Sequence, residues 1–220
     1  MCVLKSLEAV NNSISKNGSE KVFQMPDGSY IYHLNTHETN LTFQEIFIED
    51  IYFKHNLNLP QNSYIFDIGA NIGLFSIQAK IKYPGSNIFS FEPSPELYKL
   101  LFLNTKKFHS TVKTFQCGIS DYNKKVSFYY FPDYSIMSSF FQKTSVDEQI
   151  IQTGIKNSSK ISNKNSKIIS KRLLENFKKL NCQTISLSYF IKKKGIPKID
   201  LLKIDAEKSE IDILKGINKK

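Results

Sequence analysis

The stretch with the clearest chemical potential is IFDIGANIGLFSI, residues 65–77, in which small residues follow a short apolar run. The run predicts a strand that ends at Asp67, and a tight turn and a helix follow it. The turn and the helix start consist of small residues: Gly69, Ala70, Asn71 and Gly73. Such a turn lets the backbone approach a ligand and lets the helix pack on the strand. Two classes of nucleotide ligand are bound in this way.

The charge at the end of the strand separates these classes. A dinucleotide places a pyrophosphate on the turn, and the carboxylate of Asp67 would repel it. S-adenosylmethionine has no phosphate and carries a positive ammonium and a positive sulfonium. The spacing D-x-G-A-N-x-G also differs from the dinucleotide pattern G-x-G-x-x-G. We therefore expect Asp67 to face S-adenosylmethionine, and the alternative for Asp67 is a satisfied capping residue.

A second acid, Glu92 in FSFEPSP, follows the next predicted strand, 25 residues after Asp67. A carboxylate at this position can accept hydrogen bonds from two ribose hydroxyls. Because dinucleotide enzymes use the same device, Glu92 indicates an adenosine nucleoside without identifying the donor. The alternative is a carboxylate stabilised by the dipole at a helix N-terminus.

A third acidic site lies in IDLLKIDAEKSEIDILKG, residues 199–216. Asp205 and Glu207 follow a buried strand, at the sheet edge where doubly wound folds bind ligands. Asp205 would face the methyl group and its acceptor, so we expect Asp205, with Glu207, to supply a general base. Lys203 within the apolar strand needs a partner, because an unpaired buried charge is costly. An ion pair with Glu207 is one option.

Two histidines ahead of the first strand of this unit, His33 and His37, are the other candidates for a base. A histidine titrates near neutrality, which suits proton transfer. The alternative for each is a structural role. No third oxygen ligand is evident near Asp205, so we expect no metal ion.

Alternating strands and helices must position these residues. Strands are predicted at residues 63–67, 87–91 and 111–117, with helices at 73–83 and 95–108. This alternation is the signature of a parallel α/β sheet. Ahead of it, residues 21–34 predict a β-hairpin and residues 42–55 a helix. After it we expect a strand at 125–131, a mobile loop of low complexity at 156–170, a helix at 169–180, a strand at 199–204 and a helix at 207–216.

Composition and charge exclude several classes of protein. No apolar run reaches about 18 residues, so we expect no membrane span. The three cysteines lie far apart, which suits a reducing cytoplasm rather than a zinc site or a disulfide framework. Residues 151–200 hold 12 of the 30 basic residues and two of the 20 acids, so they carry the whole net charge of +10. Only Arg172 is an arginine, which disfavours a specific nucleic-acid reader. Two explanations of the positive charge remain: a solvated lysine-rich face, or attraction to an acidic partner.

Four stretches in order resemble the FkbM family of S-adenosylmethionine-dependent methyltransferases: IFDIGANIGLFS, FEPSPELYKLL, CGISD and IDLLKIDAEKSEIDILKGI. HLNTHET (33–39) and FPDYSIMSS (131–139) are similar to FkbM-type domains within or beside polyketide and nonribosomal peptide synthases. The resemblance implies a Rossmann-like methyltransferase that acts on a hydroxyl oxygen. It implies that Glu92 holds the ribose and that Gly118 and Ser120 border the adenine. It also implies that four residues hold the methionine end: Asp67, Gly69, Asn71 and Gly73.

A complete fold of this class has seven strands in the order 3-2-1-4-5-7-6, whereas this chain ends on the helix after strand four. We therefore expect an α/β Rossmann-like methyltransferase sheet that is truncated after strand four, with an N-terminal β-hairpin plus helix. The run IDLLKI would then be an exposed edge strand, which a partner chain could complete.

Three segments follow from this interpretation: a disordered N-terminus at 1–20, a hairpin and helix on the acceptor side at 21–62, and the donor-binding domain at 63–220. We expect O-methylation of a small or carrier-protein-tethered polyketide, peptide or saccharide. Residues 151–200 would help to dock an acidic carrier. The alternative is a catalytically inactive remnant or half of a split methyltransferase. Asp67 and the missing third glycine disfavour an NAD-type oxidoreductase.

Overall fold

A parallel sheet forms the centre of the molecule. The computed structural model describes residues 21–25, 28–55, 57–158 and 162–217, and the predicted disordered segment 1–20 lies outside them. Four parallel strands pair in the order β5-β4-β3-β9. Their bounds are Val112–Phe115 (β5), Asn87–Phe91 (β4), Tyr64–Ile68 (β3) and Leu201–Ile204 (β9). The predicted α/β architecture with a mainly parallel sheet is confirmed.

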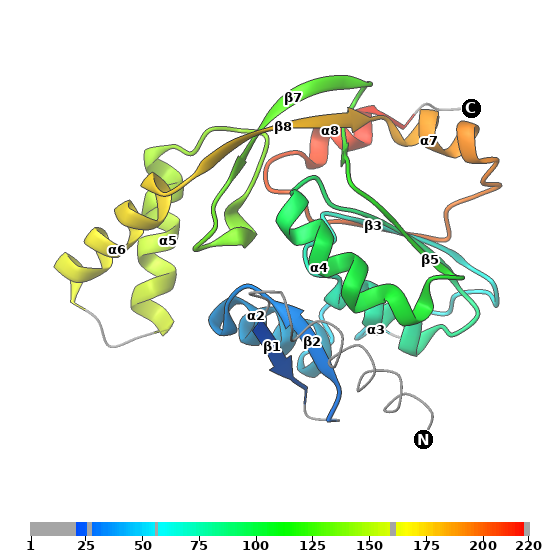
Figure 1. The fold of residues 1–220 in the computed structure, drawn as a ribbon, viewed down its shortest axis with the longest axis horizontal. Coiled ribbons are helices and arrows are strands. Elements are labelled where there is room, and N and C mark those ends of the chain that lie inside the picture. Colours follow the sequence, from blue (N-terminus) through cyan, green and yellow to red (C-terminus); the bar gives the residue numbers. More distant parts are fainter. Residues whose placement is uncertain (1–20, 26–27, 56, 159–161, 218–220) are drawn as a thin grey trace, which may run out of the picture.

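Helices cover both faces of this sheet (Figure 1). On one face lie α3 (Leu74–Lys82) and α4 (Pro95–Thr105), and a 3-10 turn, η2 (Lys106–Phe108), follows α4. On the other lie α7 (Leu187–Lys194) and α8 (Glu210–Lys215). In β3, Ile65 packs with the first pair of helices and Phe66 with the second. The strands are apolar on both faces because both faces are covered.

A β-hairpin at the N-terminal end packs against α4. Its strands β1 (Lys21–Gln24) and β2 (Tyr30–His33) pair antiparallel. Asn104 of α4 fixes the hairpin through the backbone of Tyr32: its Oδ1 accepts the N–H at 2.8 Å, and its Nδ2 donates to the carbonyl at 2.9 Å. A buried amide with these partners ties the hairpin to the sheet unit.

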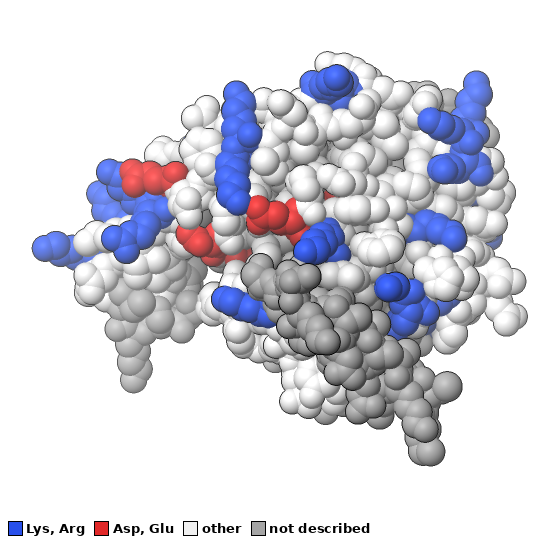
Figure 2. Space-filling model, in the orientation of Figure 1, with Lys and Arg blue, Asp and Glu red and all other residues white. Residues whose placement is uncertain are grey.

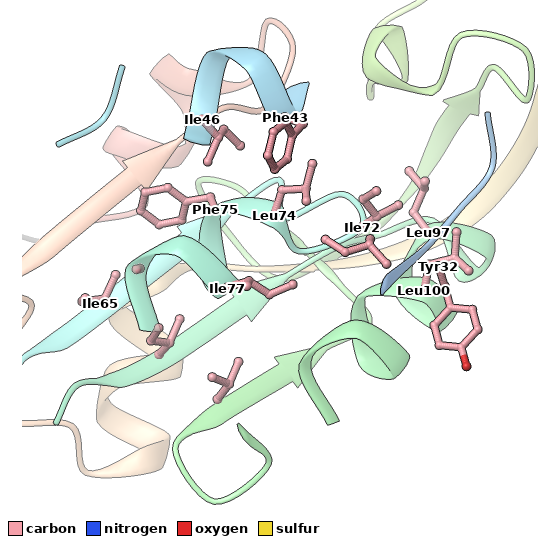
Figure 3. Packing of buried hydrophobic residues seen from close by; sticks show 14 of the residues in the cluster. Tyr32, Phe43, Ile46, Ile65, Ile72, Leu74, Phe75, Ile77, Leu97 and Leu100 are labelled. Carbon is pink, nitrogen blue, oxygen red and sulfur yellow. The ribbon is translucent and has the colours of Figure 1, made fainter. Parts of the chain in front are cut away.

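The helix predicted over residues 42–55 is wrong in its bounds. Helix α2 spans Thr36–Phe43 and continues as a π-helical turn, η1 (Gln44–Ile48). The start follows a capping signal: Asn35 accepts the N–H of Glu38, and the Glu38 carboxylate accepts from the Asn35 amide. The apolar pattern did identify the buried face, because Phe43 and Ile46 lie against α3 (Figure 3).

A second, three-stranded sheet has the order β6-β8-β7. Its strands are β6 (Gly118–Ile119), β7 (Lys124–Tyr130) and β8 (Lys178–Ile185), and a 3-10 turn, η3 (Ser135–Met137), follows β7. Strand β8 pairs with β7 antiparallel and with β6 parallel. The helix predicted over 169–180 therefore ends early, because its last residues belong to β8.

Residues 156–170, predicted as a mobile loop, are largely helical, apart from 159–161, which lie outside the described part. Helices α5 (Ser145–Ser158) and α6 (Asn163–Glu175) form a hairpin between β7 and β8 (Figure 1). Ser166 and Ser170, one turn apart on α6, are fully buried. Because serines occupy buried positions that apolar residues usually fill, the composition concealed the helix.

None of the helices in the described part of the chain combines the length and the hydropathy needed to cross a lipid bilayer.

Candidate functional site

The turn between β3 and α3 is fixed to the end of β4. The N–H groups of Gly69 and Ala70 both donate to the carbonyl of Phe91, at 3.1 and 2.9 Å. The next N–H, that of Asn71, donates to Oε2 of Glu92 at 2.9 Å. Asn71 has a φ of 50°, a conformation that asparagine tolerates better than most residues. The turn is therefore held in place by the neighbouring strand.

Two glycines near this turn are required by protein contacts. A Cβ on Gly69, whose φ is 73°, would lie 2.0 Å from the carbonyl oxygen of Asp205. A Cβ on Gly73, whose φ is 93°, would lie 2.8 Å from Cδ1 of Leu101 in α4. The sequence analysis expected small residues to admit a ligand and to allow helix packing. The structure adds the close approach of the segment after β9, which carries Asp205.

Asp67 lies inside the sheet unit and not at its ligand edge. Its side chain is fully buried, and Lys203 of β9 stands opposite it in the parallel register. Oδ1 lies 3.1 Å from Nζ of Lys203, and Oδ2 accepts a hydrogen bond from the Ser76 hydroxyl at 2.6 Å. Asp67 lines neither cavity described below. The structure thus places Asp67, which was expected to hold the methionine end of S-adenosylmethionine, away from both cavities, because the two buried charges need each other.

Glu92 does reach a cavity. It is 4% exposed, and its Oε1 accepts the N–H of Ser94 at 2.9 Å while Oε2 accepts that of Asn71. Burial raises the pKa of Glu92 to about 7, although the two backbone hydrogen bonds oppose this effect. Glu92 thus lies beside the N-terminal end of α4 and also lines a cavity.

A first, narrow cavity of about 60 Å³ lies at the carboxyl ends of β3 and β4. Apolar side chains form much of its wall: Phe91, Leu97, Ile119, Phe128 and Phe140. Three carboxylates line it, those of Glu92, Asp205 and Glu207, and its described lining holds no lysine, arginine or histidine. Such a cavity suits a ligand with an apolar ring and a positive charge, and it repels a diphosphate.

The two residues expected beside an adenine separate in the structure. Gly118 lines the first cavity, and a Cβ on it would lie 2.3 Å from Cζ of Phe140. Ser120 lines neither cavity, and its hydroxyl donates to Oδ1 of Asp121 at 2.9 Å. Gly73, which packs on α4, lines neither cavity either, whereas Ala70 lines the second.

A second cavity of about 330 Å³ adjoins the first. Both are lined by residues of the β3–α3 turn, of η3 and of the segment after β9: Gly69, Asn71, Ser135, Ile136, Asp205 and Glu207. The far wall comes from the N-terminal segment and includes Glu45 and Tyr52. In the described lining Lys203 is the one cation, and it is paired with Asp67. The two cavities form one cleft with an acidic middle.

Asp205 stands where the two cavities meet. Its Oδ2 accepts a hydrogen bond from the Tyr52 hydroxyl at 3.1 Å and lies 3.6 Å from Nζ of Lys203. Its side chain is 62% exposed. Glu207, two residues on, lies 3.7 Å from Nζ of Lys143. Burial raises the pKa of Glu207, and Lys143 opposes that shift.

Neither predicted histidine lies at the cleft. His33 is buried, hydrogen-bonds to the Thr39 hydroxyl through Nδ1 at 3.1 Å, and packs against the ring of Phe23. Burial lowers the pKa of His33. His37 is exposed on α2 and lines neither cavity. The same helix contributes Glu38 instead, since the helical period turns that side chain toward the cleft.

Sequence reasoning missed two residues of the cleft, Glu38 and Tyr52. Glu38 holds η3 across the cleft: Oε1 accepts the N–H of Ser135 at 2.9 Å, and Oε2 accepts the Ser135 hydroxyl at 2.5 Å. The stretches HLNTHET and FPDYSIMSS, which the resemblance had singled out separately, thus meet here. Tyr52 carried no signal, because its partner Asp205 is 153 residues away.

Comparisons with known proteins identify the family. Residues 67–220, more than half of the chain, match the family described as "Methyltransferase FkbM domain". The 31-O-demethyl-FK506 methyltransferase FkbM of Streptomyces tacrolimicus is 29% identical over 197 residues, which cover 90% of this chain and 75% of that protein. The AMB antimetabolite synthetase AmbE of Pseudomonas aeruginosa is 30% identical over 202 residues, which cover 88% of this chain and 9% of AmbE.

A crystal structure of methyltransferase FkbM from Methylobacillus flagellatus aligns with 75% of this chain and 31% of its own, with a TM-score of 0.45 and 14% identity. The chain thus spans less than a tenth of AmbE and less than a third of that structure. The family match begins at Asp67, near the end of β3, and covers the turn after that strand, Glu92 and the segment after β9. The chain belongs to the FkbM methyltransferase family.

Proposed function

We propose that this protein transfers a methyl group from S-adenosylmethionine, bound along the β3–α3 turn with part of the molecule in the first cavity, to a hydroxyl oxygen of an acceptor in the second. The charge of the first cavity carries the proposal: Glu92, Asp205 and Glu207 face it, and its described lining holds no basic side chain. A donor with an ammonium and a sulfonium complements these carboxylates. A dinucleotide would bring its diphosphate to three acids without a cation.

The donor side is preorganised by the backbone. S-adenosylmethionine, when bound, supplies a methyl group on a positively charged sulfur, which is a good leaving group. Ionised Glu92 would accept hydrogen bonds from the ribose hydroxyls, and its two backbone donors already fix its orientation. Phe91, Ile119 and Phe128 offer an apolar surface for the adenine ring. Asp67 does not contact the donor in this proposal. It forms an ion pair with Lys203, which in turn donates to the carbonyl of Gly69 in the turn.

Asp205 is the proposed general base. It stands at the junction of the cavities, where an acceptor hydroxyl would meet the methyl group. Most of the acceleration comes from holding that oxygen about 3 Å from the methyl carbon. As the new O–C bond forms, the hydroxyl proton passes to the carboxylate of Asp205. Oxygen as the acceptor atom is supported by the relative from Streptomyces tacrolimicus, whose name specifies 31-O-demethyl-FK506.

The second cavity favours a neutral or cationic acceptor. Its described lining includes Glu38, Glu45, Asp205 and Glu207, against the single buried cation Lys203. An acceptor with its own carboxylate or phosphate near the hydroxyl would be repelled. A hydroxylated polyketide, peptide or neutral saccharide fits this lining.

The acceptor arrives, in this proposal, on an acidic carrier domain that docks on α6. Lys164, Lys167, Lys171 and Arg172 are exposed at helical spacing, with Ile168, 51% exposed, among them. Figure 2 shows basic side chains gathered at the end of the molecule that carries α5 and α6. The likeness to a synthetase, AmbE, supports a carrier. Binding of an acidic carrier domain should weaken steeply with added salt, and charge reversal of Lys167 and Lys171 should abolish it.

Calorimetry with S-adenosylmethionine, S-adenosylhomocysteine and NAD tests the donor assignment. We expect the first two to bind and NAD to fail. Glu92→Gln should weaken binding at least tenfold, by roughly the 1.4 kcal/mol or more that loss of a charged hydrogen bond costs. Glu96→Gln on the surface of α4 is the matched control and should bind normally, since Glu96 lines neither cavity. Binding of NAD, or no binding of S-adenosylhomocysteine to folded protein, would overturn the proposal.

A further inference from the structure

We propose that Tyr52 and Lys203 are positioning residues that hold one oxygen of Asp205 and leave its other oxygen to take the acceptor proton. The inference rests on the proposed role of Asp205 as the general base. It assigns separate tasks to Oδ2 and Oδ1 of a single carboxylate.

Tyr52 is placed to donate to Oδ2 of Asp205. Its ring packs edge-on against Phe75, with centroids 5.0 Å apart at 77°, so aromatic packing sets the direction of its hydroxyl. The hydroxyl lies 3.1 Å from Oδ2 of Asp205. Burial, and then the charge of Asp205, raise the pKa of Tyr52, so the phenol keeps its proton and stays a donor.

Lys203 connects Asp205 to the donor-binding turn. Its Nζ donates to the carbonyl of Gly69 at 2.8 Å, lies 3.1 Å from Oδ1 of Asp67, and lies 3.6 Å from Oδ2 of Asp205. The carbonyl of Ile68 lies 3.5 Å from the same nitrogen, so four oxygens surround an ammonium that has three protons. The lysine cannot turn away without leaving Asp67 unpaired in the interior, which is costly. The position of Oδ2 is therefore tied to that of the glycine turn.

Both contacts fall on Oδ2. Within the described part of the chain, Oδ1 of Asp205 has no hydrogen-bond or ion-pair partner, and the side chain is largely exposed between the two cavities. The other acidic candidate, Glu207, is engaged with Lys143. In the transfer that a bound donor would support, the acceptor O–H bond breaks and its proton goes to Oδ1; the O–C bond forms as the S–C bond of the donor breaks, and the electron pair of that bond stays on sulfur. Anchoring Oδ2 aims this oxygen before the acceptor binds.

The charged and titratable groups that face Asp205 decide how its proton affinity can be tested. Tyr52 and Lys203 lie against Oδ2 of Asp205, and the carboxylates of Glu45 and Glu207 line the same cleft. Removing a donor to the carboxylate raises its pKa, and a hydrogen bond of ordinary strength corresponds to about one unit. A packing role alone would leave the pKa of Asp205 unchanged.

The test is a carboxyl carbon-13 NMR titration of the ligand-free full chain, with the Asp205 signal assigned through Asp205→Asn. Tyr52→Phe keeps the ring and should raise the pKa of Asp205 by about one unit. Lys203→Met should raise it by at least as much. Tyr83→Phe, which removes a hydroxyl bonded to Leu57, and Lys80→Met, which removes a buried ammonium bonded to Ser86, are matched controls and should change nothing.

An unchanged Asp205 pKa in Tyr52→Phe overturns the proposal, and this variant decides the matter if Lys203→Met does not fold. Titration with S-adenosylhomocysteine separates the two levels of the argument. If wild-type protein fails to bind it while the pKa shifts occur, the proposed function falls and the division of the two oxygens stands. If it binds and no shift occurs, only the positioning proposal falls.

Discussion

The two ends of the cleft are built in different ways. At the end where we propose that the donor binds, here called the donor end, successive N–H groups of one turn bond to the end of the adjacent strand, so the sheet register positions them. At the acceptor end the walls meet through pairs that are distant in sequence, Glu38 with Ser135 and Tyr52 with Asp205. The turn at the donor end is thus held by consecutive backbone hydrogen bonds, whereas the walls of the acceptor end are joined by separate side-chain contacts.

Substitution of Gly69 should have the largest effect on stability, because Gly69 lies where the two ends of the cleft meet. In Gly69→Ala the new Cβ collides with the backbone of Asp205 at a φ of 73°. Strain and overpacking together should destabilise the protein by about 4 kcal/mol, measured by urea denaturation. Gly195→Ala, also at positive φ but with no atom within 4 Å, should cost about 1 kcal/mol. Equal losses would mean that backbone conformation, and not the contact with Asp205, explains the glycine.

The buried ion pair should rank second. Asp67→Asn leaves Lys203 with one carboxylate, the largely exposed Asp205, and should cost about 3 kcal/mol of unfolding free energy. Asp50→Asn removes the partly exposed pair with Lys82 and should cost less than about 1 kcal/mol. Chemical denaturation of both variants checks the ratio. A loss at Asp67 no larger than that at Asp50 would remove the claim that the donor end depends on this pair.

The sequence predicted the strands and the turn at the donor end well, because they follow from local pattern. The run that ends at Asp67, the small residues after it and the acid after the next strand sufficed to predict adjacent strand ends. The direction of the Asp67 side chain was not predicted. Side chains in β3 alternate between the two faces of the sheet, and Asp67 points toward Ser76 of α3 and Lys203 of β9, whereas the turn after the strand reaches the cavity. Strand pairing between β3 and β9 is needed to see this, and sequence spacing does not supply it.

The acceptor end was largely beyond prediction. His33 and His37 were chosen for their chemistry, yet one is buried against Thr39 and the other is exposed. The composition of α6 hid a helix whose buried positions include serines. Asn35 and Glu38 did carry a readable helix-start signal, which the search for apolar periodicity passed over. The rest depends on side chains that come together only in the folded chain.

Loosening the acceptor end should have a smaller effect and a local one. Glu38→Gln removes an acceptor from the contact with Ser135 and should cost about 2 kcal/mol. Hydrogen exchange measured by mass spectrometry should quicken in η3 and not in β3 or β4. Glu96→Gln, which alters an exposed carboxylate bonded to Tyr130, is the control. Equal acceleration in β3 would show that the two ends do not open independently.

The smallest expected effect is the pH dependence of stability and donor affinity that Glu92 causes at the donor end. Burial raises the pKa of Glu92 to about 7, so the folded, ligand-free protein holds a proton there that the unfolded chain releases at lower pH. This residue's contribution to stability is therefore present at acidic pH and is lost as pH rises toward 7. Ribose hydroxyls instead need the ionised carboxylate, so donor affinity should change in the opposite direction.

Affinity for S-adenosylhomocysteine, measured by calorimetry, should increase about tenfold between pH 6 and pH 8, as the ionised fraction of Glu92 increases by that factor. Glu92→Gln should bind weakly and without this dependence. Glu207→Gln should keep the transition: Glu207 also lines the first cavity, but its carboxylate lies beside Lys143, whereas Glu92 accepts the N–H of Asn71 in the donor turn. The opposite result, in which Glu207→Gln removes the pH dependence and Glu92→Gln keeps it, would contradict this assignment. The carboxylate whose ionisation controls donor affinity would then be Glu207, at the junction with the acceptor end.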